Sequence, residues 1–193
     1  MALAEARTGL LTYEDYMAED EDNRRYDILD GVRHYQSGCS IQHQEVLMNI
    51  FEALRAYQRR DGQGKAVIGP RDVLIRRHPF RVRQPDALFI SRERYAGRPP
   101  QSVEPLSPAP ELAVEVLSAD ETRRILWGKI SDYCTAGVNE CWLVSPEGET
   151  VEVLRLTPGG PIREALYGSG QTLQSLTFPD LTLALDDVFH VEE

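Results

Sequence analysis

The sequence predicts a single α/β (α+β) domain in which a central mixed β-sheet is flanked by helices. Helical and strand-like patterns follow one another in the order helix, strands, helix, strands. This order is typical of helices packed on a mixed sheet and is too irregular for a barrel. A chain of 193 residues with 41% hydrophobic content can form one full-sized core. Residues 1–193 are therefore expected to form one domain.

The first third of the chain is predicted to contain two helices on either side of a hairpin. Thr12 is a suitable N-cap for a short helix over Tyr13 to Ala18. The segment from Tyr26 to Tyr35 is strand-like on both sides of Asp30-Gly31, which is a strong hairpin turn motif. A long helix is predicted from a cap at Ser40 to about Arg60. Its apolar face comprises Val46, Leu47, Ile50, Leu54 and Tyr57.

The middle of the chain is predicted to be sheet. Three successive strands are expected at Lys65 to Ile68, Asp72 to Ile75 and Val82 to Ile90. His78-Pro79 marks a turn between the last two strands. From Ala96 to Pro110, five prolines and the lack of periodicity predict a long loop.

The second half begins with Leu112 to Leu117, an almost wholly apolar segment of the kind that forms a strand buried on both faces. Ser118-Ala119-Asp120 are expected to cap a helix that runs to about Ala136 and ends at Gly137. Short strands separated by proline and glycine turns should follow. They are expected at Cys141–Val144, Val151–Leu156, Ile162–Leu166 and Leu181–Leu185, before a brief turn at 186–189.

Two carboxylates lie inside predicted strands, Asp86 and Glu115. Strand alternation places Asp86 on a largely covered face of the sheet. A buried carboxylate without a partner is costly, and two neighbouring carboxylates repel each other. A shared cation solves both problems, and Mg²⁺ is commonly held by one or two carboxylates together with waters and phosphate oxygens. We therefore predict that Asp86 and Glu115 bind Mg²⁺, with Mn²⁺ as an alternative ion.

Lys129 lies on the same helical stripe as Leu126, Ile130 and Tyr133, and this stripe should face the sheet. A lysine there could hold its ammonium near the metal, orient the attacking water and offset charge in a phosphorane-like transition state. Alternatively, its aliphatic stem covers apolar surface while the ammonium reaches water. Helical spacing alone leaves both interpretations open.

Four other polar residues are weaker candidates. His43 begins the apolar face of the long helix and could contact the scissile phosphate or a metal-bound water, or could be a core or capping histidine. Gln84 should lie on the same side of the strand as Asp86 and could bind phosphate or water, or could be a satisfied polar group of the sheet. Asp30 is explained by its turn, and Asp27 by an exposed strand position.

Several other chemistries lack their usual motifs in this sequence. It contains no glycine-rich phosphate loop, nucleophile elbow or His-Glu-x-x-His helix, which argues against nucleotide hydrolysis, serine hydrolysis and zinc proteolysis. Cys39, Cys134 and Cys141 are odd in number and lack metal-ligand spacing, so buried free thiols are expected. No apolar run approaches the length needed to span a bilayer, and no secretory leader pattern is present. We therefore expect a cytoplasmic protein without a membrane partner.

The charge is unevenly distributed along the chain. A net charge of −10 argues against indiscriminate binding along duplex DNA. Between residues 71 and 98, however, eight arginines face three acids, a local charge of +5 that leaves −15 for the rest. These arginines are Arg71, Arg76, Arg77, Arg81, Arg83, Arg92, Arg94 and Arg98. This basic segment could steer a polyanion to Asp86, or could simply be a soluble loop.

Seven motifs stand in a fairly specific order and spacing along most of the chain. They are Arg25–Gly31, His43, Gln84–Asp86, Glu115–Ser118, Lys129 with Tyr133, Gly137–Val144 and Phe178–Leu181. Together they resemble the PD-(D/E)xK nuclease superfamily, in its branch of Uma-type restriction endonucleases, a domain of unknown function.

The resemblance implies a restriction-endonuclease-like core and Mg²⁺-dependent phosphodiester hydrolysis, with Asp86 and Glu115 as metal ligands. The superfamily pattern has a lysine two residues after the second acid, where this chain has Leu117. The branch that the chain resembles relocates this lysine to the following helix, where Lys129 fits. Asp27 stands where the branch usually carries glutamate.

The leading hypothesis is therefore a metal-dependent endonuclease that acts on DNA, with His43 and Gln84 assisting Asp86, Glu115 and Lys129. A homodimer is plausible because nucleases that cut both strands commonly pair two sites. The alternative, from another functional class, is a nuclease-like fold that serves as a non-catalytic binding or assembly module.

Overall fold

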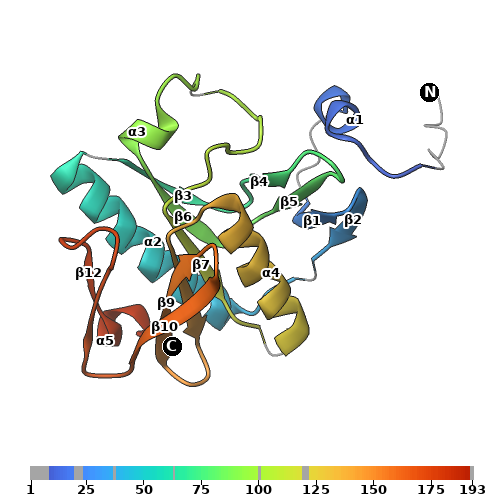
Figure 1. Cartoon of the computed structure of the whole chain (residues 1–193). Coiled ribbons are helices and arrows are strands. Elements are labelled where there is room, and N and C mark those ends of the chain that lie inside the picture. Colours follow the sequence, from blue (N-terminus) through green and yellow to red (C-terminus); the bar gives the residue numbers. More distant parts are fainter. Residues whose placement is uncertain are drawn as a thin grey trace.

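A six-stranded mixed sheet forms the centre of the structure, a computed structural model that describes residues 9–19, 24–36, 38–62, 64–99, 101–118 and 122–191 (Figure 1). β7 and β8 are parallel, and the other neighbouring strands are antiparallel. The predicted mixed sheet flanked by helices is confirmed. The strand order is β10 (Gly160–Tyr167), β9 (Thr150–Thr157), β8 (Glu140–Ser145), β7 (Leu112–Val116), β6 (Ala87–Ser91) and β3 (Gly64–Ile68).

Two long helices cover the two faces of this sheet. Helix α2 (Ile41–Asp61) packs with the apolar core on one face, and α4 (Arg123–Ala136) with the core on the other. Strand β7 is buried throughout, as predicted, and alternates between the two cores. Val114 faces the α2 side and Ala113 the α4 side. The same alternation turns Glu115 toward α4.

A smaller antiparallel sheet lies beside the central one. Its strands are β2 (Val32–Tyr35), β1 (Tyr26–Leu29), β5 (Arg81–Arg83) and β4 (Val73–Arg76), in that order. The predicted hairpin between β1 and β2 is confirmed. Asp30 and Gly31 have φ values of 54° and 81°, the pair of positive angles that a two-residue type I′ turn requires.

The prediction of one continuous strand from Val82 to Ile90 is wrong. β5 ends at Arg83, β6 begins at Ala87, and the two strands belong to different sheets. Pro85 lies between them and has no N–H with which to continue a ladder. The segment Gln84–Asp86 therefore crosses from one sheet to the other and places Asp86 at their junction.

The helix caps differ in how well they were predicted. Thr12 caps α1 (Tyr13–Ala18) in a capping box with Asp15, and Ser40 caps α2, both as expected. The cap of α4 is Thr122, whose hydroxyl accepts a hydrogen bond from the Ile125 N–H at 3.4 Å. Of the three residues predicted for this role, Ser118 precedes the helix without capping it, and residues 119 and 120 lie outside the described residues. Gly137 ends α4 with φ 83°, as predicted.

The remaining elements are short. α3 (Arg92–Tyr95) and β11 (Thr172–Gln174) were not predicted, whereas β12 (Thr182–Ala184) matches the expected alternation and α5 (Leu185–Val188) replaces the expected turn. Among the described residues, no helix is both long and apolar enough for a membrane span.

The three cysteines are free, but they are not all buried as expected. Cys141 is buried, Cys134 is half-buried and Cys39 is exposed. Cys39 is exposed because it lies in the polar connection before α2, although cysteine is usually buried.

Candidate active site

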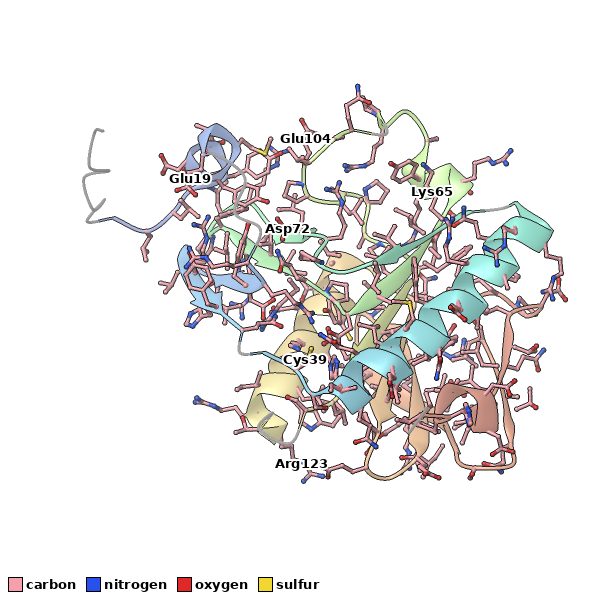
Figure 2. The ribbon with its side chains drawn as sticks, turned by 180° about the vertical axis from the view of Figure 1, so that it is seen from behind. Glu19, Cys39, Lys65, Asp72, Glu104 and Arg123 are labelled. Atoms are coloured by element: carbon pink, nitrogen blue, oxygen red, sulfur yellow. The ribbon has the colours of Figure 1, made fainter. Side chains whose placement is uncertain are left out.

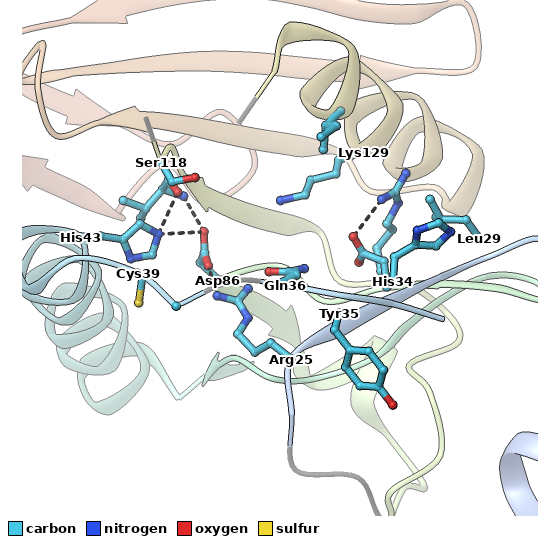
Figure 3. A pocket seen from close by; sticks show the side chains of 15 residues that line it. Arg25, Leu29, His34, Tyr35, Gln36, Cys39, His43, Asp86, Ser118 and Lys129 are labelled. Carbon is cyan, nitrogen blue, oxygen red and sulfur yellow. Dashed lines mark hydrogen bonds and ion pairs between the residues drawn. The ribbon is translucent and has the colours of Figure 1, made fainter. Parts of the chain in front are cut away.

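A cavity of about 370 Å³ lies where the two sheets meet (Figure 3). Its walls come from the β1–β2 hairpin, the first turn of α2, the crossing segment, the end of β7 and one face of α4. The ionisable residues that line it are Arg25, Asp27, His34, Cys39, His43, Arg83, Asp86 and Lys129, joined by Tyr35.

Asp86 is held at this junction by two donors. Its Oδ2 accepts a hydrogen bond from the Val116 N–H at 2.7 Å, and its Oδ1 accepts one from Arg25 Nη1 at 2.5 Å. The first contact fastens the crossing segment to the end of β7, one residue after Glu115. Asp86 is 3% exposed, so its charge depends on Arg25 for compensation.

Glu115 is 1% exposed and faces α4. Its Oε2 accepts a hydrogen bond from Lys129 Nζ at 2.8 Å, and its Oε1 accepts one from the Tyr133 hydroxyl. Burial raises the pKa of Glu115 to about 7, Lys129 opposes this rise, and the nearby charge of Asp86 adds to it. Glu115 is thus a carboxylate whose charge is favoured by one lysine.

Lys129 is also buried, at 8% exposure. Its ammonium ends on Glu115 and lines the cavity, so the interpretation in which it extends into bulk water is wrong. The predicted stripe is confirmed, because Lys129, Ile130 and Tyr133 are all buried on one face of α4. The structure therefore brings Asp86, Glu115 and Lys129 together.

His43 lies in the first turn of α2, directly beside Asp86. Its ring Nε2 is 2.9 Å from the Val116 carbonyl oxygen, a contact that places the proton on Nε2, and 3.8 Å from Asp86 Oδ2. The buried Nδ1 has no hydrogen-bond partner among the described residues. His43 is thus a residue of the candidate site and carries one unused acceptor.

Gln84, like Glu115, does not line the cavity, and its side chain belongs to a different hydrogen-bond network. Its Oε1 accepts a hydrogen bond from the Tyr26 N–H at 3.0 Å, and its Nε2 donates to Asp72 Oδ1 at 2.8 Å. Asp72 in turn accepts a hydrogen bond from the Tyr16 hydroxyl. Gln84 does not line the cavity, because the break at Pro85 turns its side chain toward this network. Its amide holds the crossing segment in place.

Asp27 was expected to be exposed and is instead buried. Its Oδ2 accepts a hydrogen bond from Arg83 Nη1 at 2.9 Å, and its Oδ1 accepts one from the Gln84 N–H at 3.2 Å. The pairing of β5 with β1 covers this position. Sequence reasoning also missed Arg25 as a site residue. Arg25 could have been found by noting that two buried carboxylates, Asp86 and Glu115, need a second cation besides Lys129.

The basic segment does not surround Asp86 as expected, since only Arg83 of its eight arginines lines the cavity. Arg81 and Arg83 pair with Asp132, Arg76 pairs with Asp30, and Arg94 pairs with Glu111. Four of the eight arginines are therefore compensated by carboxylates. The exceptions include Arg71, Arg92 and Arg98, which donate to backbone carbonyls.

The donor chemistry of the cavity fits a hard divalent cation. Asp86 and Val116 line the cavity, and Glu115 lies next to it through its hydrogen bond with Lys129. The described residues contain no group of three or more His, Cys, Asp or Glu side chains suited to a metal. Mg²⁺ does not require one, because waters and substrate oxygens complete its six ligands. Arg25 and Lys129 already balance the two acids, so a bound ion would give the site a net positive charge.

Comparisons with known proteins identify the family and agree with the fold. The family model Uma2, described as "Putative restriction endonuclease", matches residues 11–186. A crystal structure described as "a putative nuclease belonging to DUF820", from Anabaena variabilis, superposes with a TM-score of 0.76 at 16% identity. The alignment covers 93% of this chain and 97% of that one, and at this identity it shows a shared fold. The comparison with curated proteins found no match.

Proposed function

The chain belongs to the Uma2 family, and we propose on that premise that it is a metal-dependent endonuclease that hydrolyses phosphodiester bonds of DNA. The observation that carries this proposal is that Asp86 and Lys129, both buried, line one cavity, and that Lys129 Nζ lies 2.8 Å from Oε2 of a second buried carboxylate, Glu115. Buried charges of this kind are costly and cluster at functional sites.

Asp86 and Glu115 would hold Mg²⁺ or Mn²⁺. When bound, the ion supplies Lewis-acid activation of the phosphodiester and of the attacking water. The cations of the site have complementary tasks. Arg25 lines the cavity, and its buried Nε has no partner among the described residues, so it can donate to a phosphate oxygen. This contact would hold the scissile phosphate beside Asp86.

Lys129 would orient the attacking water and stabilise negative charge on the transition state. Glu115 fixes its ammonium, and Tyr133 fixes the second oxygen of Glu115, so the lysine is preorganised before substrate arrives. Because the ammonium is buried, solvent screens it less than it would a surface charge. His43 would receive a hydrogen bond from water or substrate at its free Nδ1.

The test is cleavage of plasmid and single-stranded DNA with Mg²⁺ or Mn²⁺ by the wild type, Asp86→Asn and Lys129→Gln. Asp187→Asn is the matched control, because Asp187 is an exposed acid on α5. We expect wild type and control to cleave, and each site variant to lose about 10²–10³ in rate. Undiminished cleavage by the site variants, or no cleavage by any form, would contradict the proposal.

One observation favours a non-catalytic nuclease-like module as the second candidate. Asp86 and Glu115 are each already paired with a cation of the chain, Arg25 and Lys129. Such a site is electrostatically complete without metal. Calorimetric titration with Mg²⁺ and Mn²⁺ separates the candidates: binding that is lost in Asp86→Asn supports the nuclease, whereas its absence in the wild type supports the module.

A further inference from the structure

A second cavity, of about 400 Å³, lies at the far end of strands β3 and β6 from Asp86. The register shows the arrangement, because Ile68 pairs with Ala87 next to the active site whereas Gly64 pairs with Ser91 at the second cavity. Five strand residues span about 17 Å. In Figure 2, Lys65 of the second cavity is well separated from Cys39, which lines the active site.

The lining of this cavity is cationic. Lys65, Arg92 and Arg98 line it together with Tyr95, and none of the described residues that line it is acidic. Lys65 Nζ lies 4.2 Å from the centre of the Tyr95 ring, a cation–π contact that positions the ammonium. We call this set of four residues the basic pocket.

The arginines of the basic pocket are fixed by backbone oxygens. Arg92 Nη2 donates to the Gly62 carbonyl at 2.7 Å, and Arg98 Nη2 donates to the Ser107 carbonyl at 2.7 Å. Among the described residues, neither arginine nor Lys65 forms an ion pair with a carboxylate. Three like charges gathered in a concave site are stabilised by an anion, and a phosphate suits arginine and lysine donors.

The arrangement also accounts for the basic segment that the active site does not use. Arg92 and Arg98 belong to that segment, and the extended strand β6 separates them from Asp86. With a net charge of −10, the protein repels a polyanion over much of its surface. A nucleic-acid strand bound at the active site should therefore extend toward the basic pocket, where positive charge is not compensated by carboxylates.

We propose that the basic pocket binds a backbone phosphate of the nucleic-acid strand whose scissile bond lies at Asp86. This inference rests on the proposed function. β3 is an edge strand of the central sheet and runs between the two sites. The bound nucleic-acid strand would follow this edge. Along the axis of a duplex, a span of about 17 Å corresponds to roughly five nucleotide steps of 3.4 Å, and an extended single strand covers it in fewer steps.

The experiment measures binding of the full chain to fluorescent oligonucleotides of 4 and 16 nucleotides, single-stranded and duplex, by anisotropy in EDTA. Lys65→Gln/Arg92→Gln removes two charges from the basic pocket. Arg155→Gln/Arg163→Gln removes the same charge from exposed positions on β9 and β10, at the opposite edge of the sheet. Lys65→Gln alone keeps the test valid if the double variant fails to fold.

We expect the pocket variant to bind 16-mers roughly three- to tenfold more weakly than the control variant, because charge-assisted phosphate contacts are lost. For a single strand, the slope of log K against log salt should fall in magnitude by about 0.7 for one lost phosphate contact. Four-nucleotide probes, too short to reach both sites, should bind the two variants equally. Equal affinity of the two variants for 16-mers would overturn the inference.

Competition by inorganic phosphate and by a mononucleotide tests whether the basic pocket binds a nucleic-acid strand or a free phosphate ligand. If either competes with the 16-mer only in the millimolar range, as a detached phosphate should, the strand assignment is supported. If either binds tightly in calorimetry and this binding is lost in Lys65→Gln, the pocket serves a free ligand and the proposal is overturned.

The outcomes also separate this inference from the proposed nuclease function. Pocket-dependent binding without metal-dependent cleavage would refute the nuclease and leave the phosphate site standing. Cleavage that depends on Asp86 but not on Lys65 or Arg92, with unchanged binding, would refute the phosphate site alone.

Discussion

At the scale of single residues, the candidate site is organised by the need to compensate buried acids. Asp86 depends on Arg25, and Glu115 depends on Lys129 and Tyr133. Burying such pairs contributes little to stability, because removing both charges from water costs about as much as their attraction gains. We therefore attribute these charges to function, and the supporting hydrogen bonds to the need to hold them in place.

The Tyr133 hydroxyl provides the first test. Tyr133→Phe leaves Glu115 Oε1 without its donor while keeping the ring in the core. We expect the free energy of unfolding to fall by about 1.5–3 kcal/mol, the range for a hydrogen bond to a charged group. Urea denaturation measures this change. Tyr167→Phe, on β10, is the control and should be nearly neutral; equal losses in both variants would contradict the assignment.

Asp72 gives a pH-dependent prediction. Burial raises the pKa of Asp72 above its ordinary 3.8, although hydrogen bonds from Tyr16 and Gln84 oppose the rise. The folded state therefore holds this proton more tightly than the unfolded state. The contribution of Asp72 to the free energy of unfolding consequently falls as pH rises from about 3.8 through the folded pKa, and is constant above it.

An asparagine at residue 72 should remove this contribution. Asparagine does not titrate, and it can accept from Gln84 while donating to the Tyr16 hydroxyl. The stability of Asp72→Asn relative to wild type should therefore increase with pH across this window. Denaturation curves from pH 4 to pH 8 measure the difference, and a difference that is constant with pH would contradict the prediction.

At the scale of elements, helix α4 positions the lysine and depends on its cap. The Thr122 hydroxyl accepts a hydrogen bond from the Ile125 N–H at the start of the helix. Thr122→Ala should lower the free energy of unfolding by about 1 kcal/mol. Cleavage per folded molecule should not change, since Lys129 lies nearly two turns further along the helix.

Thr135→Ala is the matched control for the α4 cap. Thr135 is exposed in the last turn of α4, where its hydroxyl donates to the Ser131 carbonyl of the preceding turn. This substitution should be close to neutral because alanine has the higher helix propensity. Thermal and urea denaturation of both variants test the comparison. A loss at Thr135 as large as that at Thr122 would mean that capping is not the cause.

At the scale of the whole molecule, metal binding should stabilise the fold. A ligand at 100 times its dissociation constant adds about 2.7 kcal/mol to the free energy of unfolding. We expect Mg²⁺ or Mn²⁺ to raise the thermal midpoint of the wild type, EDTA to reverse the rise, and Asp86→Asn to show no rise. A rise of the same size in Asp86→Asn would place the ion elsewhere.

Two expectations concern the surroundings of the whole molecule. The homodimer and the cytoplasmic location depend on contacts and conditions outside one chain, and both stay predictions. The edge strands β3 and β10 differ in their proposed roles, because only β3 of the two runs between the two cavities.

Local patterns predicted most elements because their causes are local. The Asp30-Gly31 turn, the caps at Thr12 and Ser40, and the helix end at Gly137 each depend on the conformations of a few neighbouring residues. The break at Pro85 was missed because strand-like residues stand on both sides of it, at Val82 and at residues 87–90. The N–H that Pro85 lacks separates the two strands only in the folded protein, where β5 and β6 belong to different sheets.

The mixed sheet and its flanking helices follow from sequence patterns alone, and strand alternation also turns Glu115 inward. Asp86 lies between two strands, where alternation does not apply, and helical spacing left two interpretations of Lys129 open. Which cation meets which acid depends on tertiary packing. That packing paired Arg25 with Asp86, joined Gln84 to Asp72 and brought Lys65 into one pocket with Arg92. These contacts join residues distant in the chain, and their energies depend on burial that exists only after the two sheets and α4 have packed together.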